Sequence, residues 1–138
     1  MYLLDSSILI KWLRGDPRAL ELFSSLPQAE SCISEITAFE ILIGVKSRQQ
    51  AKSVDQLLAA LKRLPVTPDI TQTAASLSLK YPQIFDRKIA HTLFDAFIAA
   101  TGIVRNLEII TTNVRHFTVL KEPQLKMRVL DEKAKKWI

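Results

Sequence analysis

The sequence predicts an α/β fold with a mainly parallel sheet covered by helices on both faces. Two observations lead to this prediction. Short apolar runs that fit strands alternate with longer runs whose apolar residues recur at helical spacing. The chain has 138 residues, which suits one domain with one core, and its 3 glycines argue against a loop-rich chain. In such sheets, binding sites form outside the carboxyl ends of the strands, so polar residues there are the first candidates for a site.

The first half of the chain predicts two strand-to-helix units, a further helix and an edge strand. Asp16 can cap a helix whose first turn contains Pro17, and Pro27 ends that helix. Ser34 can cap a helix that follows a short strand. We therefore expect strands at 2–4 and 31–33, helices at 8–13, 17–26, 34–44 and 48–61, and an edge strand at 64–66.

The second half predicts two helices, two strands and a basic tail. A helix is expected at 71–81, and residues 81–91 are polar, contain Pro82 and are interpreted as a connection that could line a groove. The helix expected at 92–104 is the most apolar in the chain. The remaining elements are strands at 107–111 and 127–130 and a basic stretch at 133–136 that precedes Trp137.

The charge of the chain favours a polyanionic partner. Its 19 Lys and Arg residues exceed its 14 Asp and Glu residues, which gives a formal net charge of +5. Nucleic acid is one candidate for this partner. Net charge indicates which molecules a protein attracts, but it does not indicate which reaction the protein catalyses.

The single cysteine and the apolar runs exclude several classes of protein. Cys32 cannot form an internal disulfide and belongs to no CxxC motif, which excludes zinc binding through sulfur and favours a reducing cytoplasm. The longest apolar stretch, 96–104, is far shorter than the roughly 20 residues that cross a bilayer. Asp5 interrupts the apolar N-terminal residues, which argues against a secretory leader. We expect a cytoplasmic protein without a membrane span.

Three acidic residues stand where a carboxylate is difficult to accommodate. Asp5 follows the first strand, where it could simply cap the next helix. Glu40 shares a helix face with Ile36 and Ile43, and Asp95 lies in the most apolar helix. Neither of these helices has Lys or Arg within four positions of its acid, so a pairing cation would have to come from elsewhere in the fold.

Three such acids predict a divalent metal if they converge. Burying an ionised carboxylate alone is costly, and neighbouring carboxylates raise each other's proton affinity unless a hard cation such as Mg²⁺ or Mn²⁺ neutralises them. Such an ion can activate water against a phosphodiester. Pairing with Lys or Arg remains the alternative for each acid.

Other chemistries lack their motifs in this chain. There is no GxGxxG or GxxxxGK[ST] phosphate loop, no nucleophile elbow and no HExxH helix. Of the two histidines, His91 is interpreted as a solvated or packing residue, whereas His116 lies beside a polar motif and is a better functional candidate.

Four segments carry a resemblance to a known family. They are the residues around Asp5-Ser6-Ser7, the pair Glu40-Ile41, the run from Asp95 to Thr101, and the run from Thr111 to Phe117. In this order and spacing they resemble the PIN-domain family, and VapC-type toxins most of all. The resemblance implies a PIN-like three-layer α/β/α sandwich with a mainly parallel central sheet. It assigns a nuclease domain to residues 1–130 and a basic C-terminal tail to residues 131–138.

The resemblance also implies roles for individual residues. Asp5, Glu40 and Asp95 match the catalytic, metal-binding acids of the family. Ser6 matches the position that supports the first aspartate, and Thr111 is expected to support the site as well.

The fourth motif, which is the run from Thr111 to Phe117, departs from the family pattern. An acid is frequent there, whereas this chain has Asn113, whose amide oxygen could orient a metal-bound water as part of the catalytic set. His116 stands where Asp is common, and we expect it, with Arg115, to contact RNA or to lie at the rim of the site. These departures leave the number of metal ions open.

The function that the resemblance implies is a metal-dependent endoribonuclease that acts as the toxin of a toxin–antitoxin pair. It implies RNA as substrate, a VapB-type antitoxin as partner and a homodimer. Basic side chains that could follow RNA phosphates, or form only a solvated face, are Lys11, Arg14, Arg87, Lys88, Arg105 and Arg115. A housekeeping PIN nuclease and a non-catalytic RNA- or protein-binding PIN module remain as alternatives.

Overall fold

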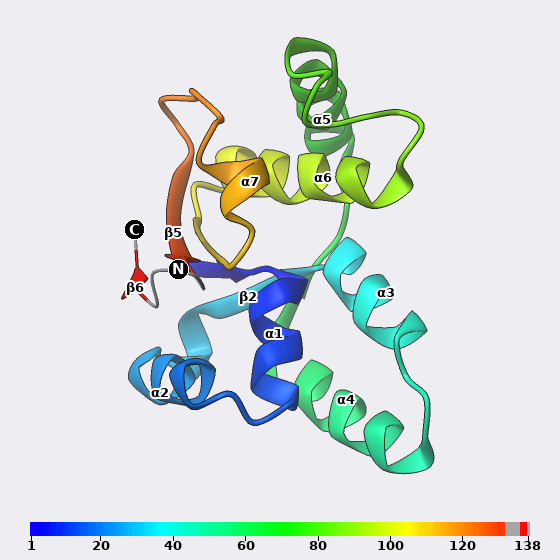
Figure 1. Ribbon diagram of the computed structural model, residues 1–138, viewed down its shortest axis with the longest axis vertical. Helices are drawn as coiled ribbons and strands as arrows, with labels where there is room; N and C mark the ends of the chain where they lie inside the picture. The colour runs from blue at the N-terminus through cyan, green and yellow to red at the C-terminus, as the bar shows by residue number, and fades with distance from the viewer. Residues whose placement is uncertain (132–135, 138) are drawn as a thin grey trace.

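A single sheet runs through the computed structural model, which describes residues 1–131 and 136–137 (Figure 1). In the described residues it has six strands in the order β3-β2-β1-β4-β5-β6. The first five are parallel, and β6 is antiparallel to β5. The strands are β1 (Tyr2–Leu4), β2 (Ser31–Ser34), β3 (Lys62–Leu64), β4 (Glu108–Thr111), β5 (Lys126–Asp131) and β6 (Lys136–Trp137).

Helices connect these strands and cover the two faces of the sheet. Asp16, Ser34 and Ser47 cap three of them by accepting backbone N–H groups of the first turn. The helices are α1 (Ser6–Leu13), α2 (Pro17–Ser25), α3 (Glu35–Ile43), α4 (Arg48–Ala60), α5 (Pro68–Lys80), α6 (Ala90–Arg105) and α7 (Val114–Phe117), with a 3₁₀ turn η1 (Gln28–Glu30).

Alternation of side chains along each strand divides the core into two layers. Leu3 and Ile109 face α5, α6 and α7, whereas the next residues along the chain, Leu4 and Ile110, face α1, α2 and α4. Figure 1 shows these two groups of helices on opposite sides of the sheet. The predicted three-layer α/β/α sandwich with a mainly parallel sheet is therefore confirmed.

The expected elements differ from the observed ones mainly at their ends. The edge strand β3 ends before Pro65, two residues earlier than expected, because proline cannot donate to a sheet. Helix α5 begins at Pro68 and not at Thr71, since proline fits the first turn of a helix.

Apart from the 3₁₀ turn η1, two short elements are absent from the sequence prediction. They are α7, which has four residues, and β6, where Lys136–Trp137 pairs with β5 inside the segment expected to be a tail. The other residues of that segment, 132–135 and 138, lie outside the described part of the chain. Both elements are too short to carry a hydrophobic period.

The fold brings the carboxyl ends of three strands to one edge of the sheet. Asp5 follows β1, Thr111 ends the neighbouring β4, and α3 with Glu40 starts directly after β2. Helix α6 packs closely against β4 at Gly102, where a Cβ atom would lie only 2.7 Å from Ile109 Cδ1. This contact fixes the helix that carries Asp95. No described helix is long and apolar enough to cross a membrane.

Candidate active site

Asp5 is almost fully buried and hydrogen-bonded through both carboxylate oxygens. Only 2% of the residue is exposed. The Ser6 backbone N–H donates to Oδ1 at 2.9 Å, and the hydroxyls of Ser7 and Thr111 donate to Oδ2 at 3.1 and 2.6 Å. The Ser7 hydroxyl also accepts the Thr112 backbone N–H at 3.0 Å. Asp5 thus caps α1, as the sequence allowed, and is tied to the end of β4 as well.

The two serines after Asp5 have different roles. Ser6 was expected to support Asp5, but the side chain that bonds Asp5 is that of Ser7, and Ser6 contributes only its backbone N–H. The Ser6 side chain instead hydrogen-bonds Glu40, which lowers the pKa of that carboxyl. Adjacent serines look alike in a sequence, so only the direction of each side chain from the first turn of α1 separates them.

Asp95, on α6, is held by two residues of the fourth motif. It is 8% exposed. Its Oδ2 accepts the Asn113 amide at 2.9 Å and is paired with His116 Nδ1. Asn113 also caps α7 by accepting the His116 backbone N–H at 3.3 Å, which places the imidazole on Asp95. Burial first, and the Asp5 charge second, raise the pKa of Asp95 to about 8, while the Asn113 hydrogen bond acts in the opposite direction.

Glu40, on α3, has an oxygen without a partner. Its Oε1 is buried and has no hydrogen-bond partner in the described part of the chain. Burial first, and then the charges of Asp5 and Asp95, raise the pKa of Glu40 to about 7. Burial likewise raises the pKa of Asp5, against the hydrogen bonds of Thr111, Ser7 and Ser6. The fold therefore brings the three acids into one electrostatically coupled site.

These residues fit a divalent cation in their chemistry. Three carboxylates offer the oxygen ligands that Mg²⁺ and Mn²⁺ prefer, their mutual repulsion needs a positive charge, and Glu40 Oε1 has a free acceptor position. Within the described residues, no three Asp, Glu, His or Cys side chains already form a closed metal-binding cluster. An ion would therefore require the acidic side chains to close in around it.

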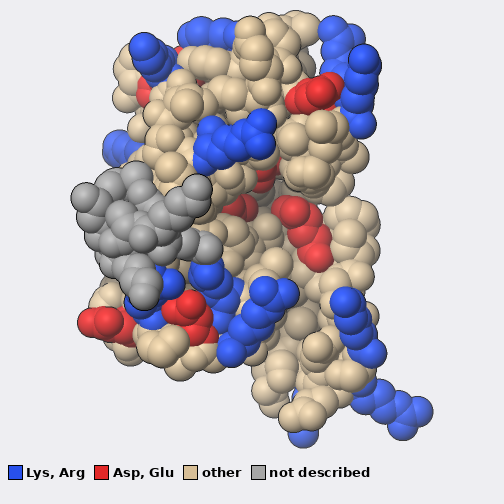
Figure 2. Space-filling view, in the orientation of Figure 1, with Lys and Arg blue, Asp and Glu red and all other residues tan. Residues whose placement is uncertain are grey.

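Basic and acidic side chains lie close together on one face of the molecule. Figure 2 shows acidic atoms in a hollow at the centre of one face, with Lys and Arg side chains on both sides of it. Arg115 is exposed on α7 beside His116. Burial first, and the Arg115 charge second, lower the pKa of His116.

The other basic residues named from the sequence are spread over the surface. Lys11 lies 3.9 Å from Asp16, and Arg105 donates to Thr67. Arg14 lines a groove beside Glu40. Arg87, Lys88 and His91 are exposed in and after the connection between α5 and α6.

Comparison with known proteins identifies the family. The PIN-domain family model matches residues 2–122. This chain belongs to the PIN-domain family. Ribonuclease VapC19 from Mycobacterium tuberculosis is 35% identical to it over 126 residues, which is 90% of this PIN-domain chain and 98% of VapC19. Ribonuclease VapC10 from the same species is 32% identical over 123 residues, or 88% of this chain and 90% of VapC10.

Solved structures agree with this assignment. A toxin–antitoxin complex from Klebsiella pneumoniae contains a chain that is 28% identical to this PIN domain, with a TM-score of 0.74. The match covers 91% of this chain and 95% of that chain.

Proposed function

We propose that this PIN-domain protein is a metal-dependent endoribonuclease and the toxin of a toxin–antitoxin pair. One observation carries the proposal: Asp5 and Asp95 are buried, Glu40 is half-buried and coupled to them, and the pKa values of all three are raised, while the buried Oε1 of Glu40 has no partner in the described residues. Such a site is unfavourable without a cation. The similarity to named ribonucleases over nine-tenths of the chain supports the same activity.

The three acids would hold Mg²⁺ or Mn²⁺, which when bound lowers the pKa of water and neutralises charge on a phosphodiester. The chain's own groups supply the positioning. Ser7 and Thr111 fix Asp5, while Asn113 and His116 hold Asp95 through Oδ2. Glu40 is the acid with the freedom to approach the ion. Groups that orient metal ligands in this way typically affect activity 10- to 100-fold.

The fourth motif places neutral or basic side chains where an acid would otherwise add a ligand. Asn113 and His116 both use their side chains on Asp95, and Arg115 remains exposed beside them. We assign Asn113 to the orientation of Asp95 and Arg115 to contact with an RNA phosphate at the rim.

Cleavage of a mixed RNA panel in Mg²⁺, in Mn²⁺ and in EDTA tests the activity. We expect cutting by the wild-type chain in either ion, no cutting in EDTA, and loss of cutting in Asp95→Asn. RNA binding without cutting under every condition would favour the non-catalytic PIN module instead. A toxin differs from a housekeeping nuclease in a further observable: its expression arrests growth, and co-expression of its antitoxin relieves the arrest.

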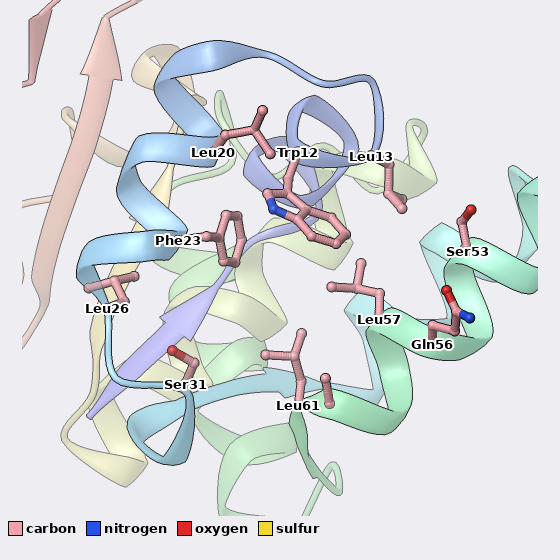
Figure 3. Close-up of a pocket in the computed structure, with 11 residues that line it drawn as sticks. Trp12, Leu13, Leu20, Phe23, Leu26, Ser31, Ser53, Gln56, Leu57 and Leu61 are labelled. Carbon is pink, nitrogen blue, oxygen red and sulfur yellow. The ribbon is translucent and has the colours of Figure 1, made fainter.

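An antitoxin needs a binding surface, and the chain offers an apolar one away from the acids. A pocket of about 450 Å³ lies between α1, α2 and α4. Figure 3 shows Trp12, Phe23 and Leu57 turned toward its centre. Apolar side chains of a VapB-type segment would cover this surface. Leu20→Asp should weaken co-purification with the antitoxin, whereas Leu79→Asp, which changes a more exposed leucine on α5 outside this pocket, should not.

A second apolar surface suits a second copy of the chain. Phe39, Leu42 and Ile43 are exposed on α3, and Phe39 contacts Phe94 of α6 edge-on. An apolar patch of this kind marks an interface. We assign it to the homodimer, and Ile43→Asp, which changes the most exposed of the three, should convert the dimer to a monomer in sedimentation velocity measurements.

A further inference from the structure

A groove beside Glu40 is not explained by the metal-binding acids. It lies between α1, α3 and α4 and has a volume of about 510 Å³. We propose that it binds the nucleotide next to the cleaved phosphodiester, with Arg14 and Lys46 on its phosphate and Gln49 on its base. This inference rests on the proposed ribonuclease function. Arg14, Glu40, Lys46 and Gln49 are among the residues that line it.

The groove meets the acidic site at Glu40. Glu40 lines the groove and is electrostatically coupled to Asp5 and Asp95. An RNA strand whose scissile phosphate lies at these acids must continue along the surface on each side of them. The groove offers that strand a recess at the point where it leaves the acids.

The charges of the groove suit a phosphate. Arg14 follows α1 and Lys46 precedes α4, and both are exposed. In the described part of the chain neither forms an ion pair, whereas Arg63, Lys80 and Arg128 each do. Among the described residues that line the groove, Glu40 is the one acid. Two cations without carboxylate partners attract a phosphodiester and release its counterions.

The remaining lining suits an unpaired base. Ile10, Leu13, Ile41, Val45 and Val54 provide an apolar surface against which a base can pack. Gln50 Oε1 already accepts the Lys46 backbone N–H at 2.7 Å. By contrast, the Gln49 amide makes no hydrogen bond within the described residues, so it can donate to and accept from a base edge. Gln49 is therefore the residue that would select the base.

Binding of a fluorescein-labelled single-stranded RNA in EDTA tests the phosphate contacts without cleavage. The double variant Arg14→Ala/Lys46→Ala is compared with Arg48→Ala/Lys52→Ala, which removes the same charge from exposed α4 positions outside the groove. The groove variant should lose about 10-fold in affinity at low salt and reduce the slope of log K against log salt by about 1.4, or 0.7 per phosphate contact. The control variant should show a smaller loss of affinity and a smaller change in the salt slope than the groove variant.

Cleavage in Mg²⁺ separates this inference from the function on which it rests. The groove variant should raise KM more than it lowers kcat, and Gln49→Ala should change the base preferred next to the cut. If wild type cleaves RNA but the groove variant binds it with the affinity and salt slope of the control, the inference is wrong, the nuclease stands, and the groove is left for a protein partner. If wild type neither binds nor cuts RNA, both proposals fall. Circular dichroism checks that the variants remain folded.

Discussion

Asp5 and Glu40 belong to the same site but differ in how fully their carboxylate oxygens are hydrogen-bonded. Asp5 receives hydrogen bonds on both oxygens, from the first turn of α1 and from the end of β4. Glu40 keeps a buried oxygen without any partner in the described residues. The contrast indicates that the protein fixes Asp5 before a ligand binds, whereas the free oxygen of Glu40 gains its partner from the ligand. A buried orphan oxygen costs stability, so its presence points to a ligand.

The largest effects are expected from removing either charge. Asp5→Asn and Glu40→Gln should each lower cleavage by more than the roughly 10- to 100-fold that follows loss of a group that orients a metal ligand. Their effects on stability should differ in sign. In EDTA at pH 8, Glu40→Gln should raise the free energy of unfolding, because it removes a repelled charge without breaking a network. Asp5→Asn should lower it, because an amide nitrogen would face donors.

Urea unfolding of both variants in EDTA measures this difference. Equal shifts in the same direction would show that the fold holds Asp5 and Glu40 alike, and would contradict a fixed Asp5 beside a Glu40 that awaits a ligand.

The next effect concerns the hydroxyl that fixes Asp5. Thr111→Val keeps the shape of a fully buried side chain but removes the 2.6 Å donor to Asp5. We expect a loss of about 1–3 kcal/mol in stability and of about 10- to 100-fold in cleavage. Thr101→Val is the matched control, since Thr101 is also buried but its hydroxyl donates to the Phe97 carbonyl of its own helix and not to an acid. A loss of cleavage in the control as large as in Thr111→Val would assign the effect to packing.

The stability of the metal-free chain should depend on pH because of the same acids. With pKa values of about 7 for Glu40 and about 8 for Asp95, the folded chain binds more protons than the unfolded chain between about pH 4.5 and about pH 8. The free energy of unfolding should therefore fall as pH rises toward 8, by at least about 1.4 kcal/mol, the equivalent of one pKa unit. The lowered pKa of His116 acts in the opposite direction, but it is one group against three acids, because the pKa of Asp5 is raised as well.

Urea titrations from pH 5 to pH 8 in EDTA provide the measurement. Glu40→Gln should flatten the curve around pH 7, and Mg²⁺ should raise stability most at the alkaline end. A wild-type stability that increases with pH over this range would contradict coupled burial of the acids.

The smallest effects should separate the two serines. Ser7→Ala removes bonds to Asp5 and to the Thr112 backbone, and we expect about a tenfold loss of cleavage. Ser6→Ala removes the hydrogen bond that lowers the pKa of Glu40, so the pH–rate profile should move to higher pH with little loss at its plateau. Identical pH profiles for the two variants would remove the distinction between these neighbours.

Much of the fold follows from the sequence because its signals are local. Leu3 and Leu4 lie on opposite faces of one strand, and caps such as Asp16 and Ser34 mark where helices begin. The three acids stand out because Glu40 and Asp95 lie among apolar neighbours. Local sequence patterns do not show which side chains from different strands and helices point toward one another. The bond from Thr111 to Asp5 and the pairing of His116 with Asp95 join residues 106 and 21 positions apart, so only the folded chain reveals them.

Equilibrium binding of Mn²⁺, followed by electron paramagnetic resonance without RNA, shows whether Glu40 helps to hold a divalent cation. Wild type and Glu40→Gln are compared at pH 7.5, with Glu35→Gln as control, because Glu35 lies on the same helix but is paired with Arg63. We predict that wild type and the control bind Mn²⁺ alike and that Glu40→Gln binds it at least tenfold more weakly. Equal affinity in all three proteins would contradict the assignment of the unpartnered Glu40 oxygen to a metal ion.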